Sequence, residues 1–314
     1  MLSFGLCVPS PFHEPRIRVN ATPAPFYTFT GNLLAERTLT FADWSPGRTQ
    51  RARLESFQVG GKGINVSRRL QQLGAPTLAL CFAGGATGEE CTSRLLEEAL
   101  PFHAFEAEHP TRAGTVVRGG PGGETTFLGP DAAPGATAVR MCAEFLDAQP
   151  SGVLALCGSI PGWDDPAFDC LRAALERWLA RGPLVADTYG PPLAWLAARP
   201  LALVKINLTE FDGLFPPGPN RSEVGARLSA ISGAGGPRAW VVTDGPGPVW
   251  LRESGAPAER LLPPVVREVS ATGSGDVLLG CILEARWRRG QSLRAAVAAA
   301  LPAAAAHAAR VLNP

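Results

Sequence analysis

The sequence has no excess of charge of either sign, because 29 Lys and Arg residues face 28 Asp and Glu residues and leave a formal net charge of +1. A protein that binds nucleic acid or anionic membranes without specificity uses a strong basic field, so this balance excludes both classes. Any anion must therefore bind at a local site. With 314 residues, 46% of them hydrophobic, the chain can form a large buried core, which excludes a disordered protein.

Cysteine pairs and long apolar runs are also missing. The seven cysteines show no CxxC spacing, which favours reduced thiols in the core over disulfides or a zinc site. The longest apolar tract, Ala295–Ala309, contains Pro302 and falls short of a membrane span, so we expect a packed C-terminal helix. Residues 1–25 lack the basic start of a signal peptide, and we predict an irregular extension of a cytoplasmic protein.

Between Leu78 and Pro248, short apolar runs alternate with longer amphipathic segments, which is the pattern of βαβ units and a mainly parallel sheet. We predict strands over Leu78–Ala83, Val153–Cys157, Leu184–Asp187, Ala202–Ile206 and Trp240–Thr243, and helices over Gly88–Leu100, Pro166–Ala180, Pro192–Ala198 and Glu223–Ser232. Such a chain forms a three-layer α/β/α domain whose ligand crevice lies at the carboxyl ends of the strands.

Two regions depart from this alternation, Phe26–Val59 and Thr111–Phe127. Their Thr, Arg and Val residues alternate without helical spacing, which favours antiparallel strands. These strands would form a small sheet set apart from the main one. That sheet is predicted to be either a lid over the crevice or an ordinary extension of the main sheet's edge.

The first glycine-rich cluster is Gly60-Gly61-Lys62-Gly63-Ile64-Asn65-Val66, followed by a helical segment. Its glycines let the backbone approach a ligand closely, and the amino end of the following helix attracts an anion. The spacing of a Walker A loop is absent, and a purely structural turn is the alternative. Lys62 and Lys205 are the only lysines of the sequence, so both positions favour a compact point charge.

The second cluster, Thr272-Gly273-Ser274-Gly275-Asp276, comes directly before an apolar run that we predict to be a buried helix. A Gly-x-Gly turn at the amino end of such a helix points backbone N–H groups at a developing anion. In the functional interpretation, Asp276 is a general base that takes the proton of a hydroxyl group as this group attacks a phosphoryl group. The alternative is that Asp276 only complements the helix dipole.

Two further clusters follow apolar strands. In Lys205-Ile206-Asn207-Leu208-Thr209-Glu210, Asn207 and Glu210 offer the oxygen ligands that magnesium prefers, usually through water, and Lys205 can contact nucleotide phosphates. The alternative is a capping box in which Asn207 and Glu210 close a helix end, and both interpretations can hold together. Thr243-Asp244-Gly245 is a glycine turn directly after a strand, where nucleotides often bind.

In this order and spacing, the clusters resemble the PfkB family of carbohydrate kinases, within the ribokinase-like superfamily. The resemblance runs from Phe26 to the C-terminus, and Gly60–Arg68 and Thr272–Asp276 are its signature regions. It implies a ribokinase-like, Rossmann-like α/β/α core with a small β-sheet lid. One kinase domain would cover residues 26–314, with lid strands from about 26–59 and 111–127.

The resemblance also implies roles for individual residues. The reaction would transfer the γ-phosphoryl group of ATP to a sugar hydroxyl with the help of Mg²⁺. Asp276 would be the catalytic base, and the anion hole would be formed by Gly273, Ser274 and Gly275. The positions beside ATP would be Lys205, Asn207, Thr243, Asp244, Gly245 and Thr272. Asn207 and Glu210 would support magnesium through water.

The chain resembles one branch of the family more narrowly, the 1-phosphofructokinases and tagatose-6-phosphate kinases. Glu36 stands where this branch has an Asp that binds sugar hydroxyls, and Gly47–Arg51 matches its Gly-x-x-x-Arg segment. The resemblance implies a ketose phosphate as acceptor. The substrate-binding residues would be Glu36, Arg48, Arg51, Gly60, Gly61, Lys62, Asn65 and Arg112.

Several sugar-reading positions depart from this branch. Glu36 is longer than Asp by a methylene, Gly114 replaces an Asn after Thr-Arg, and Thr126 replaces another Asn. Two alternatives therefore stay open: a kinase of an unphosphorylated sugar or nucleoside, and a regulator that binds a sugar phosphate or nucleotide without turnover. In the family that the chain resembles, lids of this kind can pair between two chains, so the resemblance allows a homodimer through the lid. We expect no nucleic-acid or membrane partner.

Overall fold

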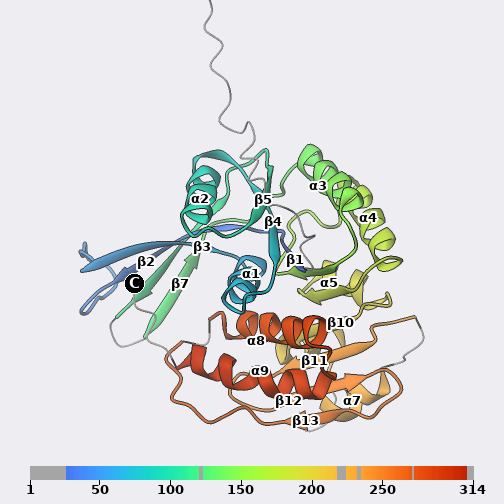
Figure 1. Ribbon diagram of the computed structural model, residues 1–314. Helices are drawn as coiled ribbons and strands as arrows, with labels where there is room; N and C mark the ends of the chain where they lie inside the picture. Colours follow the sequence, from blue (N-terminus) through green and yellow to red (C-terminus); the bar gives the residue numbers. More distant parts are fainter. Residues whose placement is uncertain (1–25, 120–122, 218–223, 232–234, 271, 310–314) are drawn as a thin grey trace, which may run out of the picture.

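The computed structural model describes residues 26–309 except residues 120–122, 218–223, 232–234 and 271 (Figure 1). The predicted extension over residues 1–25 lies outside this part of the chain. Two β-sheets organise the molecule, a large one sandwiched between helices and a small one that projects to the side. Within the described ranges, no helix combines the length and apolar character needed to cross a lipid bilayer.

The large sheet has nine strands in the order β13-β12-β11-β10-β9-β8-β1-β4-β5. All neighbours from β5 to β11 are parallel, and β12 and β13 add an antiparallel edge. Along the sheet from one edge to the other, the strands are β13 (Glu259–Leu261), β12 (Val249–Glu253), β11 (Ala239–Thr243), β10 (Leu203–Asn207), β9 (Leu184–Asp187), β8 (Val153–Cys157), β1 (Phe26–Thr30), β4 (Thr77–Ala83) and β5 (Phe102–Glu106).

Helices cover both faces of this sheet, and each helical layer closes its own part of the hydrophobic core. One layer contains α1 (Lys62–Gln72), α2 (Gly85–Glu97), α8 (Ser274–Leu283), the π-helical turn η3 (Glu284–Arg288) and α9 (Leu293–Ala308). The other contains α3 (Ala136–Ala148), the 3₁₀ turn η1 (Pro166–Phe168), α4 (Asp169–Leu179), α5 (Pro191–Ala197), α6 (Leu208–Leu214) and α7 (Val224–Ala230). The three-layer architecture predicted from the alternating pattern is therefore present.

Strand β1 corrects the prediction that lid strands begin at residue 26. All five residues of Phe26–Thr30 are buried, and the strand pairs in parallel with β4 on one side and β8 on the other. A strand covered by helices on both faces has no exposed side to mark with polar residues. The two threonines of β1 nevertheless mimic the alternation of an antiparallel strand. Strand β5, helix α3 and the β12–β13 edge were not predicted either.

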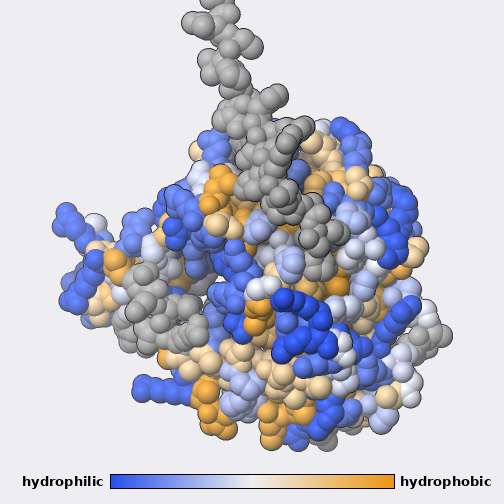
Figure 2. Space-filling view, viewed as in Figure 1, coloured by the Kyte–Doolittle hydropathy of each residue, from blue (hydrophilic) through white to orange (hydrophobic). Residues whose placement is uncertain are grey.

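The small sheet is the predicted lid, with strand order β3-β2-β6-β7. Its strands are β2 (Leu34–Thr40), β3 (Leu54–Gly60), β6 (Arg112–Arg118) and β7 (Glu124–Leu128). The outer pairs are antiparallel as predicted, whereas β2 and β6 run parallel and are connected through β3, α1, β4, α2 and β5. In the space-filling view the lid projects from the left side of the body, and its outer end is mainly hydrophilic (Figure 2).

The order of the strands reverses at β1, which separates β4 and β5 from β8 to β11. Crossover connections leave a crevice at the carboxyl ends of the strands beside such a reversal. The loops after β1 and β8, at Asn32 and Ser159, open into this crevice, and the lid strands β2 and β3 border it. The topology thus places the glycine-rich clusters and the lid around one space.

Candidate active site

One cavity of about 610 Å³ brings most of the predicted site residues together. It lies at the carboxyl ends of β1, β8, β9, β10 and β11, between the lid and the amino end of α8. The predicted residues that line it are Glu36, Gly60, Gly61, Lys62, Asn65, Arg112, Lys205, Asn207, Thr243, Gly245, Thr272, Gly273, Ser274, Gly275 and Asp276. Residues from six separate parts of the sequence therefore meet in one place.

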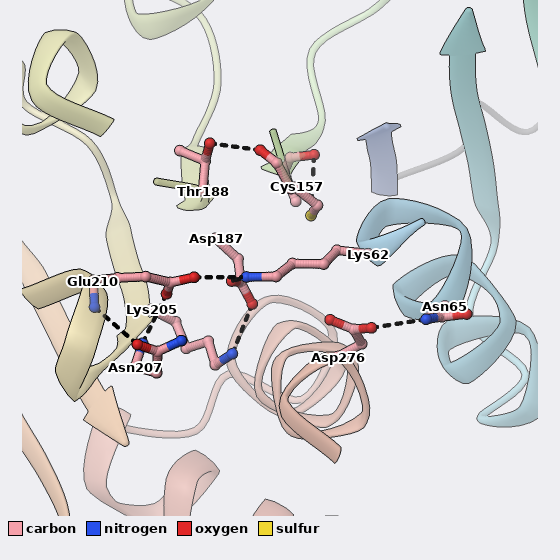
Figure 3. Close-up of polar contacts among 11 residues, drawn as sticks. Lys62, Asn65, Cys157, Asp187, Thr188, Lys205, Asn207, Glu210 and Asp276 are labelled. Carbon is pink, nitrogen blue, oxygen red and sulfur yellow. Dashed lines mark hydrogen bonds and ion pairs between the residues drawn. The ribbon is translucent and has the colours of Figure 1, made fainter. Parts of the chain in front are cut away.

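Asp276 sits in the first turn of α8 with its side chain nearly buried at 6% exposure. Its Oδ2 atom accepts a hydrogen bond of 2.8 Å from Nδ2 of Asn65 on α1 (Figure 3). Burial raises the pKa of Asp276 to about 6, and the nearby negative charge of Asp187 adds to this shift. A carboxylate with a pKa close to neutrality can accept and release a proton under ordinary conditions.

The turn before Asp276 has the geometry of an anion-binding nest. Gly273 adopts a φ of 79°, which is in the left-handed region that favours glycine. At Gly275 a Cβ atom would lie 2.8 Å from the Nζ atom of Lys205, so a larger residue would push this ammonium group away. The amino end of α8 and a lysine thus converge on the same small volume.

The two lysines of the chain share one counter-ion that the sequence did not reveal. Asp187, at the end of β9, is fully buried, and its Oδ1 and Oδ2 atoms accept hydrogen bonds of 2.8 Å from Lys62 and 2.7 Å from Lys205 (Figure 3). Burial alone would raise the pKa of Asp187, but the two ammonium groups outweigh it and lower the pKa. Asp187 therefore stays ionised and holds both cations at the floor of the cavity.

Asn207 and Glu210 form the predicted capping box at the start of α6. Asn207 Oδ1 accepts from the Glu210 backbone N–H at 2.8 Å, and Glu210 Oε2 accepts from the Asn207 N–H at 2.9 Å. The second Glu210 oxygen lies 3.1 Å from Lys62 Nζ. Burial tends to lower the pKa of Lys62, but Asp187 and Glu210 outweigh this effect and raise it, so the ammonium group keeps its proton.

The half of the cavity beneath the lid is lined by polar side chains. Gln58 Nε2 donates a hydrogen bond to Glu36 Oε1, and the two residues face each other across β2 and β3. Arg112, the first residue of β6, borders the same space, together with Asn32 and Ser159. The opposite half is mainly apolar, with Val249, Pro264, Val266, Leu301, Ala304 and Ala305 among its lining residues.

Besides Glu210, three predicted residues do not line the cavity. Arg48 and Arg51 are exposed in the connection between β2 and β3, at the outer part of the lid. Asp244 lies in the turn after β11, where its backbone carbonyl accepts a hydrogen bond from Gly247 at 2.7 Å, and only its neighbours Thr243 and Gly245 reach the cavity wall. A ligand role for these three side chains stays a prediction.

Comparison with known proteins identifies relatives of the whole arrangement. The model of the pfkB family of carbohydrate kinases matches residues 33–311. The ATP-dependent 6-phosphofructokinase isozyme 2 of Escherichia coli is 32% identical over 235 residues, which cover 72% of this chain and 74% of the relative. The 1-phosphofructokinase of Rhodobacter capsulatus is 28% identical over 272 residues, 82% of each protein. That of Bacillus subtilis is 29% identical over 190 residues, which cover 60% of this chain and 62% of the relative.

Solved structures agree with this similarity. The crystal structure of phosphofructokinase-2 from Escherichia coli in complex with fructose-6-phosphate superimposes with a TM-score of 0.82 and 26% identity, covering 91% of this chain and 94% of the other. A structure from Thermotoga maritima titled as a possible 1-phosphofructokinase reaches a TM-score of 0.74 at 19% identity over 91% of this chain and 92% of that one, which supports the fold alone. The ribokinase-like fold with a lid is thus confirmed.

Proposed function

The chain belongs to the pfkB family of carbohydrate kinases, and on this premise we propose that it transfers the γ-phosphoryl group of ATP to a hydroxyl group of a ketose phosphate. The observation that carries the proposal is Asp276, a buried carboxylate with a pKa of about 6 at the amino end of α8. It lines the same cavity as Glu36 and Arg112 of the polar half and as the Gly273–Gly275 turn. A general base is needed where a hydroxyl group meets a phosphoryl group.

In the proposed mechanism, the acceptor hydroxyl donates its proton to Asp276 as its oxygen attacks the γ-phosphorus atom. Negative charge on the transferred group is stabilised by the amino end of α8 and by Lys205, whose ammonium group lies against Gly275. Asn65 donates a hydrogen bond to the Asp276 carboxylate and so orients it toward the acceptor. Asp187 keeps the positive charge of Lys205 in place without binding substrate itself.

The apolar half of the cavity, which includes Ala304, Ala305 and Val249, suits the flat base of a nucleotide. The polar half beneath the lid then receives the sugar, with Glu36 and Gln58 as hydrogen-bonding groups for its hydroxyls. The γ-phosphate would lie between the two halves, beside Thr272 and the turn that follows it. In this arrangement the acceptor hydroxyl lies beside Asp276 and opposite the leaving group of ATP, as an in-line phosphoryl transfer requires.

Asn207 and Glu210 offer side-chain oxygen donors of the kind that hold a magnesium ion through water. Among the described residues there is no group of three or more His, Cys, Asp or Glu side chains placed to hold a metal. The two Glu210 oxygens already pair with Lys62 and with the Asn207 N–H. Mg²⁺ commonly keeps several waters and binds through one carboxylate and substrate phosphates, where it neutralises phosphate charge. Asn207, which lines the cavity, and its capping partner Glu210 would hold such an ion through water.

The charge of the polar half supports an anionic acceptor. Arg112 is a cavity-lining guanidinium, and its side chain is 15% exposed. Guanidinium groups bind phosphate oxygens in a bidentate manner. The named activities of the relatives, 6-phosphofructokinase and 1-phosphofructokinase, fit a ketose phosphate. We propose fructose 1-phosphate or tagatose 6-phosphate as the acceptor. Arg48 and Arg51 would bind its phosphate only if a moving lid or a second copy in a homodimer brought them closer to the cavity.

A panel of acceptors tests the proposed function. We expect ADP release from ATP and Mg²⁺ with fructose 1-phosphate, tagatose 6-phosphate or fructose 6-phosphate. We expect at least about 100-fold lower kcat/KM with fructose, ribose or adenosine, because these acceptors lack the phosphate that would bind the Arg112 guanidinium. The measurement is a coupled ADP assay with each acceptor at varied concentration. Preference for an uncharged acceptor would refute the phosphate site while leaving the kinase assignment intact.

The pKa of Asp276 gives a second prediction. Because the base works only without its proton, we expect kcat to fall about tenfold for each pH unit below about 6 and to reach a plateau above it. The Asn65→Leu variant removes a hydrogen bond that stabilises the charged carboxylate, so its midpoint should move to higher pH. The measurement is kcat from pH 5 to pH 8 at saturating substrates. A profile without an acid limb near pH 6 would contradict the assignment of Asp276.

A further inference from the structure

The carboxylate of Asp131, from a distant loop, forms an ion pair with Arg112, the cation of the polar half of the cavity. Asp131 lies in the connection between β7 and α3, and its Oδ1 atom accepts a hydrogen bond of 2.8 Å from the Arg112 guanidinium. The same oxygen accepts a second hydrogen bond of 2.8 Å from Nδ2 of Asn32. Asn32 Nδ2 also donates to Ser159 Oγ at 2.8 Å. One oxygen atom thus rests on a cation and an amide that both face the cavity.

The donors and the acceptor of this cluster differ in their exposure to solvent. Asn32 is 8% exposed and the Arg112 side chain 15%, so both donors are held by their surroundings. The Asp131 side chain is 50% exposed and can turn into solvent. The Nε atom of Arg112 is buried and has no hydrogen-bond partner among the described residues. Arg112 and Asn32 therefore form a fixed anion site in which, within the described part of the chain, the Arg112 Nε–H group is still free to donate, and the Asp131 carboxylate is the group that can leave this site.

A carboxylate oxygen and a phosphate oxygen make the same kind of contact with a guanidinium and an amide. We propose that Asp131 is an internal competitor for the acceptor: its carboxylate occupies the site of an anionic acceptor group, and the phosphate of the acceptor displaces it from Arg112 and Asn32. This inference rests on the proposed function, because it assigns the acceptor's phosphate to this cluster. It adds a residue that sets acceptor affinity and discrimination.

The competition has a defined energetic consequence. When a site is open only part of the time, the apparent affinity of its ligand falls by the open fraction. Hydrogen bonds to charged groups contribute enough for the closed form to dominate, so we expect roughly 5- to 50-fold weaker acceptor binding than in an open site. An acceptor without a phosphate cannot replace the charged hydrogen bonds that Arg112 and Asn32 lose when Asp131 leaves them. Asp131 therefore penalises uncharged sugars at the Arg112 end of the cavity.

The test compares Asp131→Asn with the wild-type protein. The variant keeps the size of the side chain and removes its charge, and the exposed position of Asp131 should leave folding unchanged. We expect KM for the phosphorylated ketose to fall roughly 5- to 50-fold, with kcat within about twofold and KM for ATP unchanged. Asp147→Asn is the matched control, since it neutralises an Asp in an exposed pair with Arg177 on α3 and α4, and it should change neither constant.

Two further measurements identify the cause. In Arg112→Gln, adding Asp131→Asn should no longer lower KM, because the competition needs the guanidinium. A KM that rises in Asp131→Asn would overturn the proposal and make Asp131 a direct ligand of the sugar hydroxyls. A KM that stays within twofold of the wild-type value would also overturn it, because the carboxylate would then exert no competition.

Binding without turnover separates this inference from the proposed function. Calorimetry with inorganic phosphate in the absence of nucleotide should show tighter binding to Asp131→Asn than to the wild-type protein, and no gain when Arg112→Gln is also present. If the acceptor panel shows activity only with uncharged sugars, the proposed function fails, yet a gain in phosphate affinity would still establish the competition. Equal phosphate binding by both proteins would refute the competition even in an active sugar-phosphate kinase.

Discussion

Replacing Asp276 with asparagine is expected to lower kcat by roughly 10²- to 10⁴-fold, the range that a positioned general base contributes. Asparagine fills the same space, and its side-chain oxygen can still accept the hydrogen bond from Asn65 at 2.8 Å. It cannot accept the proton of the acceptor hydroxyl. The loss should therefore appear in the chemical step and leave substrate binding almost intact. Single-turnover kinetics and a nucleotide titration measure these two quantities separately.

The neutral variant should also be more stable at neutral pH, or at least no less stable. The wild-type carboxylate is charged, buried and close to Asp187, and these effects raise its pKa to about 6. A raised pKa means that the folded state disfavours the ionised form, so removing the charge removes a cost. Loss of activity together with loss of folding would contradict this interpretation. Activity near the wild-type rate would exclude Asp276 as the base.

Replacing Asp187 with asparagine is expected to lower the free energy of unfolding by about 3–5 kcal/mol, because it leaves two ammonium groups without their shared counter-ion. Lys205 has a side-chain exposure of 4% and Asp187 of 0%, so water cannot take over the lost interaction at this pair. Lys62 is 29% exposed and keeps Glu210 as a partner, which limits its share of the loss. Urea unfolding at neutral pH measures the difference.

The pH dependence of stability distinguishes this cluster from an ordinary packing defect. The lysines lower the pKa of Asp187 against the effect of burial, so its stabilisation is present above the unfolded pKa and disappears as pH falls through the folded pKa. In Asp187→Asn this part of the acid sensitivity should vanish. Asp169→Asn is a control at an exposed pair with Arg172, where the Asp169 side chain is 75% exposed, and we expect less than about 1 kcal/mol.

Local patterns predicted much of the main sheet and several helices. The predicted bounds of Val153–Cys157 and Leu184–Asp187 agree with β8 and β9, because a short apolar run between turn residues has few other ways to be buried. The capping box at Asn207 could also be predicted, because all its contacts lie within four residues of the sequence. Strand β1 was misplaced, because its neighbours β4 and β8 are far away in sequence.

The sequence by itself determined which chemical groups this protein has available: two lysines, a glycine-rich turn before each of two helices, and Asp276 at the start of the second. Those motifs depend on short spacings, which fix local backbone geometry. Only the tertiary structure decided that both lysines meet on Asp187, and that Asp131 reaches Arg112 and Asn32 from another loop. Contacts between residues 18 to 125 positions apart depend on how strands are ordered in the sheet, and local spacing does not encode this order.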